Sequence, residues 1–463
     1  MFRNKLNYRN NKSVAIIILL LSMGILISII FGINLYQPVI NNTKGYKDQK
    51  NDLVEIQKNI IPTEIWNDSY STTETDRGYD IILDGNYIYT VGDTYHSSLS
   101  DYNIIVLKHN KSGFQINYTT WNTSLFDFGK GIAVDSNHNI YVVGYTQGGG
   151  EEDILLIKFD SNLNQLWNKT YNFSNEEKGK DIVIDQNDNI YLVGNTYNQS
   201  LSQDVALVMK LDSNGDSIWN KSIYFNNNNH DGEEIELCGD FLYITGKAIQ
   251  LVSSSYDIYL AKLDPDKNLI WNQSWGGSLS DQVYGLAVDE SQNIYITGGS
   301  SSFSLSKDAF ILKYNSLGNK IWNLTFGGAD VDIGRDIIVD ASNYIYIAGS
   351  SEDIDSKLIF NDPFIAKFYP NGSKLWNFTW KGFSQGSITA ITLDSEVNMY
   401  FVSNIQISTD QDIYVYKYKV GTPPPTTTNP IPGFEITWLL VSFSIFIGFM
   451  AILSRKKLNL EFS

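Results

Sequence analysis

Cysteine and histidine, the residues that build most metal and redox sites, are scarce in this sequence. Of its 463 residues one is cysteine, Cys238, and four are histidine. A single cysteine excludes an intramolecular disulfide and any multi-cysteine zinc or iron–sulfur site. The four histidines (His96, His109, His138 and His230) share no spacing that a metal site would need. The sequence therefore predicts neither a metal centre nor a cofactor.

Positive charge is also scarce. The chain has 34 Lys and Arg residues against 51 Asp and Glu, which gives a net charge of −17. Binding to nucleic acid requires a basic surface that neutralises phosphates, so we expect no nucleic-acid partner. The motifs of serine hydrolases (G-x-S-x-G), zinc proteases (H-E-x-x-H) and P-loop nucleotide-binding enzymes are absent as well. The sequence predicts a protein that is not an enzyme.

Two long uncharged runs, one near each end of the chain, predict membrane helices. Residues 14–35 carry no charge and are long enough to span about 30 Å of hydrocarbon. Residues 1–13 are basic and contain no acidic residue, so the positive-inside rule places them in the cytoplasm and the linker 36–61 outside. A cleaved signal peptide is the alternative interpretation of the run 14–35.

The second uncharged run covers residues 436–453, inside a predicted transmembrane helix at 434–454, and is followed by a basic tail, 455–463, which we also place in the cytoplasm. Residues 421–433 (GTPPPTTTNPIPG) are rich in Pro and Thr and predict an extended stalk. The Pro-Gly-Phe motif at 432–434, with its apolar run and basic tail, resembles the C-terminal surface anchors of exported archaeal proteins of the PGF type. That resemblance implies a cell-membrane protein with its middle part outside the cell.

The segment between these runs repeats itself with a period of about 50 residues. Each repeat carries a strand-like motif, such as Ile-Tyr-Val-Val-Gly ending at Gly144 and Ile-Tyr-Leu-Val-Gly ending at Gly194. The tyrosines of the seven motifs are Tyr89, Tyr141, Tyr191, Tyr243, Tyr295, Tyr346 and Tyr400. A fixed period of this size is typical of repeat architectures.

Within each repeat, four short runs of strand character are separated by turn residues. In the fifth repeat these runs cover 285–289, 293–299, 308–314 and 320–326. The turns carry Asn, Asp, Gly and Ser, as tight hairpins require, and no repeat shows a helical periodicity of useful length. Four antiparallel strands per repeat are typical of a propeller blade. The sequence therefore predicts an all-β, seven-bladed β-propeller over residues 62–420.

The repeats resemble the beta-propeller repeat family, also called SBBP, of bacterial and archaeal surface proteins. The segments that carry the resemblance are DAFILKY from Asp308, IWNLTFGG from Ile321 and IIVDASNYIYIAG from Ile337. The resemblance implies the propeller fold. It implies little about function, because propellers host many unrelated activities.

A Trp-Asn pair in the fourth strand of most repeats predicts how the ring closes. The pairs begin at Trp167, Trp219, Trp271, Trp322 and Trp376. The first repeat has Ile116-Asn117 at the corresponding place, and the seventh repeat ends after its third strand. The missing strand occurs ahead of the first repeat as Ile65-Trp66-Asn67. We therefore expect this N-terminal strand to complete the seventh blade and remove an open edge of the ring.

This closure brings both membrane linkers to the face that carries the short turns between the first and second strands and between the third and fourth. The longer connections, 144–153, 246–257 and 349–362, belong to the opposite face. Loops on a rigid scaffold are the usual place for recognition. We therefore expect the face with the longer connections to point away from the membrane and to bind a surface protein or a polysaccharide.

An acidic residue stands four positions before the predicted first strand in five repeats: Asp76, Asp127, Glu177, Asp281 and Asp332. Four further acids follow closely in their repeats: Asp80, Asp181, Glu234 and Asp336. We expect these side chains near the distal mouth of the channel, where a negative funnel would attract a cation or a basic partner. The alternative is structural: each carboxylate accepts hydrogen bonds from backbone amides between neighbouring blades. Repetition in almost every blade favours the structural alternative.

Two other patterns have both a binding and a structural interpretation. Segments such as Asp135-x-Asn137-x-Asn139 resemble the opening of a calcium loop, but the next strand follows too soon for six to eight oxygen ligands. We expect them to be hairpin turns with Asx hydrogen bonds. The segment Lys210 to Trp219 resembles the tryptophan-docking turn of quinoprotein propellers. That resemblance implies a quinone-dependent oxidoreductase as the alternative to surface recognition.

All six Trp-Asn pairs continue as N-glycosylation sequons, Asn-x-Ser or Asn-x-Thr. The asparagines are Asn67, Asn168, Asn220, Asn272, Asn323 and Asn377. Successive residues of a strand point to opposite faces of the sheet, and the fourth strand of a blade is the outermost. We expect these asparagines to be exposed at the rim of the propeller and to be glycosylated in the exported protein. The alternative is that Asn and Ser or Thr only hydrogen-bond to each other at an exposed edge.

Overall fold

The computed structural model describes residues 62–420 except 124, 149–150, 174–175, 225–229, 250–254, 329, 353–360, 381–384 and 407–409. The membrane helices predicted at 14–35 and 434–454, with the tails, linker and stalk beside them, lie outside the described residues. The described residues form strands and turns. Among them no helix is long and apolar enough to span a bilayer.

In this part of the chain, 28 strands form seven four-stranded sheets, the blades of a propeller. Blade 1 contains β2 (Asp76–Asp84), β3 (Tyr87–His96), β4 (Asp101–Asn110) and β5 (Gln115–Trp121); blade 2 contains β6 (Asp127–Val134), β7 (Ile140–Thr146), β8 (Asp153–Phe159) and β9 (Gln165–Tyr171). Blade 3 contains β10 (Glu177–Ile184), β11 (Ile190–Asn198), β12 (Gln203–Leu211) and β13 (Ser217–Ile223); blade 4 contains β14 (His230–Cys238), β15 (Phe241–Ile249), β16 (Tyr256–Leu263) and β17 (Leu269–Trp275). Blade 5 contains β18 (Asp281–Val288), β19 (Ile294–Ser300), β20 (Asp308–Tyr314) and β21 (Lys320–Phe326); blade 6 contains β22 (Asp332–Val339), β23 (Ile345–Glu352), β24 (Asn361–Phe368) and β25 (Lys374–Thr379). Blade 7 contains β26 (Gln385–Leu393), β27 (Asn398–Gln406), β28 (Gln411–Lys419) and β1 (Thr63–Tyr70).

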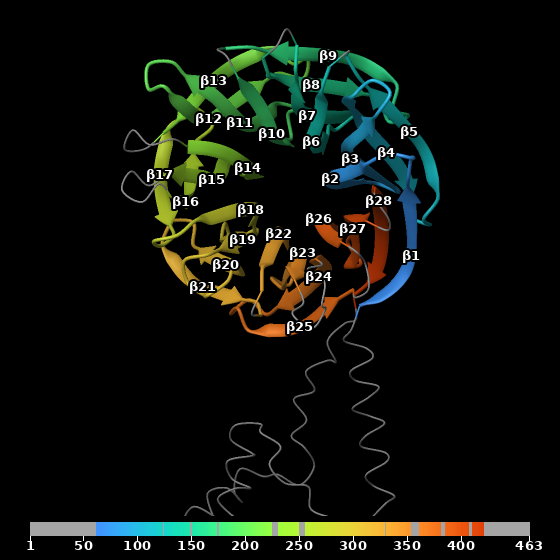
Figure 1. Cartoon of the computed structure of the whole chain (residues 1–463). Coiled ribbons are helices and arrows are strands. Elements are labelled where there is room, and N and C mark those ends of the chain that lie inside the picture. Colours follow the sequence, from blue (N-terminus) through green and yellow to red (C-terminus); the bar gives the residue numbers. More distant parts are fainter. Residues whose placement is uncertain are drawn as a thin grey trace, which may run out of the picture. The chain divides into compact units, whose positions relative to one another are not determined.

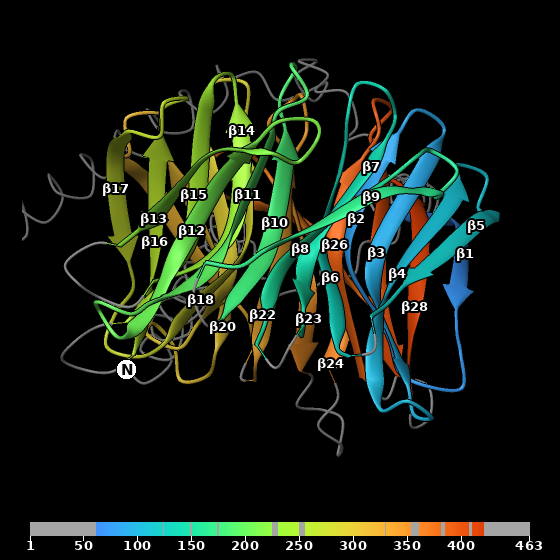
Figure 2. The same cartoon turned by 90° about the horizontal axis from the view of Figure 1, so that it is seen from above.

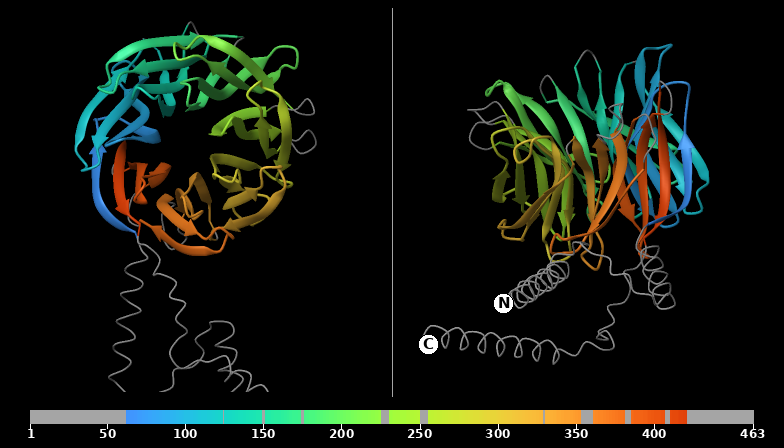
Figure 3. Two further views of the ribbon diagram at one scale, coloured as in Figure 1. Left: turned by 180° about the vertical axis from the view of Figure 1, so that it is seen from behind. Right: turned by 60° about the horizontal axis from the view of Figure 1, so that its bottom comes forward.

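The seven blades surround a central channel (Figure 1). The first strand of each blade lies at the channel and the outermost strand at the rim, an arrangement that is also clear from behind (Figure 3). The strands run between the two faces of the ring (Figure 2). We call the face with the turns between strands one and two and between strands three and four the turn face, and the opposite one the loop face. The prediction of an all-β, seven-bladed propeller is confirmed.

The N-terminal strand closes the ring, as predicted. β1 pairs antiparallel with β28 from Thr63 opposite Lys419 to Tyr70 opposite Ile413. The fourth strand of blade 7 thus comes from the beginning of the propeller chain. The first residue of β1 and the last residue of β28 are neighbours, and both lie at the turn face.

In blade 1 the predicted position of the fourth-strand pair is wrong by one residue. In the other blades the tryptophan lies opposite a lysine of the neighbouring strand, as Trp167 lies opposite Lys158. In blade 1 the residue opposite Lys108 is Asn117 rather than Ile116. Asn117 therefore occupies the tryptophan position, and Tyr118 occupies the asparagine position.

The first strands begin earlier than the sequence predicted. β18 starts at Asp281, four residues before the predicted start at 285, because a bulge between Val283 and Gly285 lets the ladder with β19 continue. The ladder of each of the seven first strands has a register shift at the equivalent place. Bulges of this kind re-aim the side chains beside them. Here they lie directly at the channel.

Packing between consecutive blades forms the core. Val143 and Leu156 of blade 2, for example, share one buried cluster with Leu192 and Met209 of blade 3. Full burial of an aliphatic side chain of this size contributes about 2 kcal/mol. The large tyrosines of the repeated motif are buried as well, and Tyr141 has no exposed surface. This repetition of interfaces explains the fixed period of the sequence.

In blades 2, 4, 5 and 7 the tryptophan of the outer strand docks on a glycine of the following blade. Trp167 lies against Gly215, whose φ of 78° is in the left-handed region, and a Cβ there would lie 2.9 Å from the indole ring. Trp66 of β1 meets Gly113 of blade 1 in the same way. Its Nε1 also donates a hydrogen bond to the carbonyl oxygen of Lys111, at 3.0 Å. The Trp-containing turns therefore join neighbouring blades.

Candidate functional site

The five acids predicted near the channel mouth begin the first strands of their blades, at the loop face, and their side chains are buried. The exposed fraction is 6% for Asp332 and 0% for the other four, Asp76, Asp127, Glu177 and Asp281. None of the five is among the residues that line the central cavity. Each instead belongs to the connection between its own blade and the blade before.

Hydrogen bonds explain this burial. Asp127 accepts a bond from the backbone N–H of Thr123, at 2.6 Å, in the link from blade 1. Asp281 and Asp332 accept bonds in the same way from the N–H of the residue four positions earlier, at 2.9 and 2.7 Å. Asp76 follows the same pattern, and Glu177 accepts a bond from the hydroxyl of Thr196. These are bonds of the kind that the structural interpretation requires. Ligand binding by the five side chains stays a prediction.

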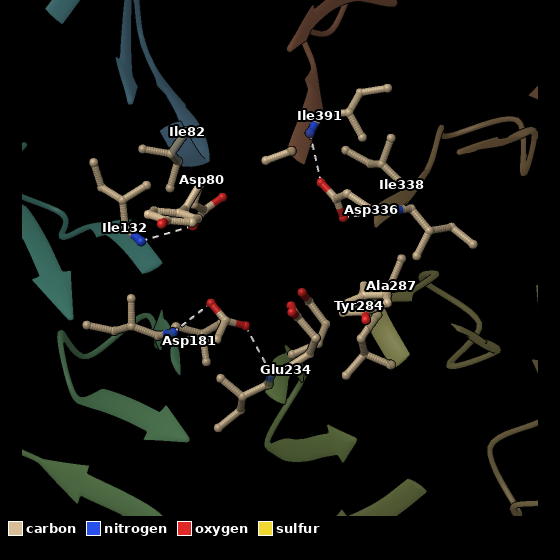
Figure 4. Close-up of a pocket in the computed structure, with 18 of the residues that line it drawn as sticks. Asp80, Ile82, Ile132, Asp181, Glu234, Tyr284, Ala287, Asp336, Ile338 and Ile391 are labelled. Carbon is tan, nitrogen blue, oxygen red and sulfur yellow. Dashed lines mark hydrogen bonds between the residues drawn. The ribbon is translucent and has the colours of Figure 1, made fainter. Parts of the chain in front are cut away.

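A cavity of about 350 Å³ lies at the centre of the propeller and is lined by the first strands. Asp80, Asp181, Glu234 and Asp336 surround its open centre (Figure 4). Glu236 lines it as well, together with apolar side chains such as Ile82 and Ile338. The second group of acids in the sequence, rather than the first, therefore forms the acidic lining of the channel.

Three of these aspartates join consecutive blades. One oxygen of Asp80 accepts a bond from the N–H of Ile132 in blade 2, at 2.9 Å. Asp181 and Asp336 reach the next blade in the same manner, with N–O distances of 3.0 and 2.8 Å. The other oxygen of each accepts a bond from the N–H of the following residue in its own strand. Each aspartate thus serves both as a link between blades and as part of the cavity wall.

Burial changes the proton affinity of this lining. It raises the pKa of Asp80, Asp181 and Asp336 to about 7 each, with a further contribution from the other carboxylates of the ring. Burial likewise raises the pKa of Glu236 to about 8 and that of Glu234 well above its ordinary value. Carboxyl groups this close cannot all ionise without mutual repulsion. Near neutral pH the cavity therefore holds a mixture of protonated and ionised acids, which can both donate and accept hydrogen bonds.

A layer of cations and aromatic rings lies beside the acids, one residue earlier in the first strands. The ammonium group of Lys130 lies 3.4 Å from the ring centre of Tyr79 in the preceding blade. The Arg335 guanidinium lies over Tyr284 at 4.6 Å, and burial lowers the pKa of Lys130 to about 7. The lining thus offers acids, a partly neutral amine and aromatic faces to a ligand. Among the described residues no group of three or more His, Cys, Asp or Glu is arranged to hold a metal ion.

Sequence reasoning missed Lys130, Tyr79 and Glu236 as cavity residues. Their position in the repeat was the available signal: Tyr79 and Lys130 follow the repeated glycine of the first strand and are the residues at which the strand bulges. Residues at that position line the cavity in blades 1, 2, 3, 5 and 7. Glu236 stands out only as an acid in a strand position that is apolar in most other blades, as at Ile82 and Val183.

The calcium-like segments form the expected Asx turns. One oxygen of Asp135 accepts bonds from the N–H groups of Asn137 and Asn139, both at 2.9 Å. Asp185 does the same with Asn187 and Asn189. These aspartates cap their own hairpins at the turn face.

The six sequon asparagines lie on the outermost strands β1, β9, β13, β17, β21 and β25, and the side chains of all six are exposed. The tryptophans beside them are partly or fully buried. The predicted alternation of Trp and Asn at the rim is therefore present. Glycosylation itself stays a prediction.

Comparison with known proteins supports the repeat assignment. The model of the family described as Beta-propeller repeat, SBBP, matches residues 127–151 and 275–303, which contain the first two strands of blades 2 and 5. A relative at 22% identity over 209 residues is an uncharacterized WD repeat-containing protein of Acanthamoeba polyphaga mimivirus. The match covers 40% of this chain and only 14% of that protein.

Solved structures with a similar arrangement include the polysaccharide lyase Uly1, with a TM-score of 0.48 at 10% identity over 76% of this chain and 91% of that one. The β-propeller domain of the Trilobed protease from Pyrococcus furiosus matches with a TM-score of 0.44 at 10% identity, over 77% of this chain and 100% of the other. Similarities at this level carry no argument about activity. Together with the seven blades, the two family-model matches confirm the propeller-repeat part of the resemblance.

Proposed function

We propose that this protein is a membrane-anchored recognition or scaffolding protein of the cell surface, not an enzyme, and that it binds a protein or a polysaccharide through the loop face. Its anchors are residues 14–35 and the PGF-like segment at 434–454, as in archaeal surface proteins. The pairing of Thr63 with Lys419 supports this orientation. Since the propeller chain begins and ends at the turn face, anchors on both sides hold that face toward the membrane.

The observation that carries the proposal is a set of exposed apolar side chains on the loop face. The exposed fraction is 63% for Leu99, 53% for Leu279 and 51% for Phe303. These residues stand in connections between strands two and three or between blades, on the loop face. Apolar side chains on loops of a rigid scaffold are typical of an interaction site.

The test uses the full chain in lipid nanodiscs, screened against proteins and polysaccharides released from the envelope of its own source. A variant that combines Leu279→Ser with Phe303→Ser changes the loop face. Phe114→Ser, at a residue that is 71% exposed in a turn of the opposite face, is the matched control. We expect the loop-face variant to weaken binding about tenfold or more and the control to bind like the unaltered protein.

Equal weakening by both variants would contradict recognition through the loop face. Redox turnover on addition of pyrroloquinoline quinone and calcium would replace the proposal by the enzymatic alternative. Protease protection of residues 62–420 on intact cells would contradict their placement outside the cell.

A further inference from the structure

A second acid accompanies each of the five buried acids of the loop face. It comes from the beginning of the third strand of the preceding blade, so that every pair bridges two blades. In each pair the charge of one acid contributes to a raised pKa of the other, or the two side chains flank the same glycine. The pairs are Asp412 with Asp76, Asp101 with Asp127, Asp153 with Glu177, Asp257 with Asp281 and Asp308 with Asp332.

The links between blades show how close these pairs are. A Cβ on Gly327, in the link from blade 5 to blade 6, would lie 2.5 Å from Oδ2 of Asp332 and 2.8 Å from Oδ1 of Asp308. A Cβ on Gly276, one blade earlier, would clash with Asp257 and Asp281 in the same way. The two carboxylates therefore flank the link on both sides, and glycine leaves the space between them open.

The boundary between blades 1 and 2 shows that hydrogen bonds within the protein do not satisfy this arrangement everywhere. Asp101 is only 5% exposed, and its Oδ1 accepts no hydrogen bond from the described residues. Asn103, two residues later and 6% exposed, also has an Oδ1 without a hydrogen-bond donor among them. Asp127, across the boundary, is fully buried. A buried carboxylate oxygen without a hydrogen-bond donor is costly, so such an atom calls for a ligand or a proton.

The donor set indicates the chemical class of the ligand. Two carboxylates and an amide oxygen are hard ligands, and the hydroxyls of Thr123 and Thr146 lie beside Asp127. Two negative charges match one divalent cation. Calcium accepts six to eight oxygens in irregular geometry and completes its shell with water, whereas magnesium demands a regular octahedron. Sites of this composition in extracellular modules bind calcium with a Kd of about 0.1–1 mM.

We propose that the boundary between blades 1 and 2 binds a calcium-type divalent cation through Asp101, Asn103 and Asp127. The ion joins the third strand of one blade to the first strand of the next. It neutralises two buried charges that otherwise repel each other across the boundary. At the boundaries of Asp153 with Glu177, Asp257 with Asp281 and Asp308 with Asp332, residues of the link between the blades donate hydrogen bonds to one acid of each pair.

The experiment uses the full chain in detergent, stripped with chelator and titrated with calcium chloride alone. We expect binding by calorimetry with a Kd of about 0.1–1 mM and a melting temperature that rises by about 2 °C or more at about 10 mM calcium. Asp101→Asn lowers the number of bound ions by one. Without calcium this variant melts at the same temperature as the unaltered protein or higher, because a buried negative charge next to Asp127 is gone.

The matched control is Asp266→Asn, which removes an exposed acid of a turn whose carboxylate accepts no hydrogen bond from the described residues. It should keep the full number of ions. A second measurement uses terbium, whose emission on excitation of tyrosine would report a bound ion beside Tyr102 and should decrease when calcium competes. Tyr102→Phe should reduce this emission without changing calcium binding.

Two outcomes would overturn the proposal. One is an unaltered protein that binds no calcium and keeps its melting temperature up to about 10 mM, because a shared proton then satisfies the pair. The other is an Asp101→Asn variant that binds as many ions as the unaltered protein. If Asp101→Asn does not fold, the terbium and calcium titrations of the unaltered protein decide the question.

Discussion

Asp80, Asp181 and Asp336 show how one side chain can combine a structural and an electrostatic role. Each accepts two backbone hydrogen bonds, one of them from the next blade, and these bonds favour the ionised form. Burial acts in the opposite direction and is the larger effect, since it raises the pKa of all three to about 7. The links between blades are therefore built from groups that titrate near neutral pH.

This chemistry predicts a protein that is more stable in mild acid than at neutral pH. An acid whose pKa is about 7 or 8 when folded and near 4 when unfolded binds more protons in the folded state between those values, so the free energy of unfolding falls as pH rises from about 4 to about 8. Lys130, whose pKa is lowered to about 7, makes the free energy of unfolding rise with pH, but only above about pH 7. The Asx aspartates, such as Asp135, have lowered pKa values and lose their contribution only below about pH 4. Melting curves from pH 4 to 8 should show the highest melting temperature near pH 5.

Glu236→Gln tests the source of this dependence. The amide keeps the shape of the side chain but cannot ionise. It therefore removes one buried acid, whose pKa is raised to about 8 by burial. We expect the variant to melt at a higher temperature than the unaltered protein at pH 8, and the difference to shrink at pH 5. Glu290→Gln, at an exposed acid, is the control and should change neither value. A melting temperature that rises from pH 5 to pH 8 would contradict the assignment.

At the scale of single elements, β1 holds the two ends of the propeller together without a covalent link. Its ladder with β28 is supported by Trp66, whose ring lies against Gly113 of blade 1. Trp66 also stacks on His109, with ring centres 6.4 Å apart. The strand therefore contacts both the last blade and the first. Other outer strands are joined to their blades by a hairpin, but β1 is joined to its blade by non-covalent contacts without a hairpin.

We predict that Trp66→Ala releases β1. Loss of a large aromatic side chain from such packing costs about 3 kcal/mol, and here no hairpin keeps the strand in place. Hydrogen exchange measured by mass spectrometry should become faster along Thr63–Tyr70 and in β28. Trp167→Ala in blade 2 is the control, because β9 remains tied to β8 by its hairpin and exchange should rise only locally. Equal protection of β1 in both variants would contradict its role as the closing strand.

The elements differ in how far the sequence could predict them. The closing strand was predictable because the seventh repeat lacks a Trp-Asn pair and the pair occurs ahead of the first repeat. The shift in blade 1 was predictable too, since Lys108 and Asn117 have the same spacing as Lys158 and Trp167. The cavity lining was harder to predict. Which acid faces the channel depends on the bulge in the first strand, and hairpin periodicity alone does not reveal a bulge.

The pairing of acids across blades could not be predicted from the sequence, for a different reason. Asp101 and Asp127 stand in different blades and in strands of different order, third and first. Their proximity follows from how one blade is rotated against the next. Such information lies in the packing of whole sheets rather than in the local pattern of either strand.

At the scale of the whole molecule, the outer strands give the propeller an unusual rim. The residue before the tryptophan is an exposed aliphatic in five of the six outer strands: Ile65, Leu166, Ile218, Ile270 and Ile321 have exposed fractions of 48–52%. A sequon asparagine follows each of these tryptophans. A ring of exposed aliphatic side chains on outermost strands favours association of one propeller with another. Glycans attached beside these side chains would cover them.

We predict that protein from its native source carries glycans on at least two of the six rim asparagines. All six lie on outermost strands with exposed side chains, where an attached glycan meets solvent.

Asn117 provides a matched control within the same chain, because it also stands in a sequon but takes the tryptophan position. Its Nδ2 donates a 2.6 Å bond to the carbonyl oxygen of Asn162 in the next blade, so we expect it to be modified less than the rim sites. Intact mass and glycopeptide analysis should show hexose-spaced additions, and substitution of one modified rim asparagine by Gln should remove one glycan without changing the melting temperature. The mass of the bare polypeptide, or full modification of Asn117 with empty rim sites, would contradict this account of the rim.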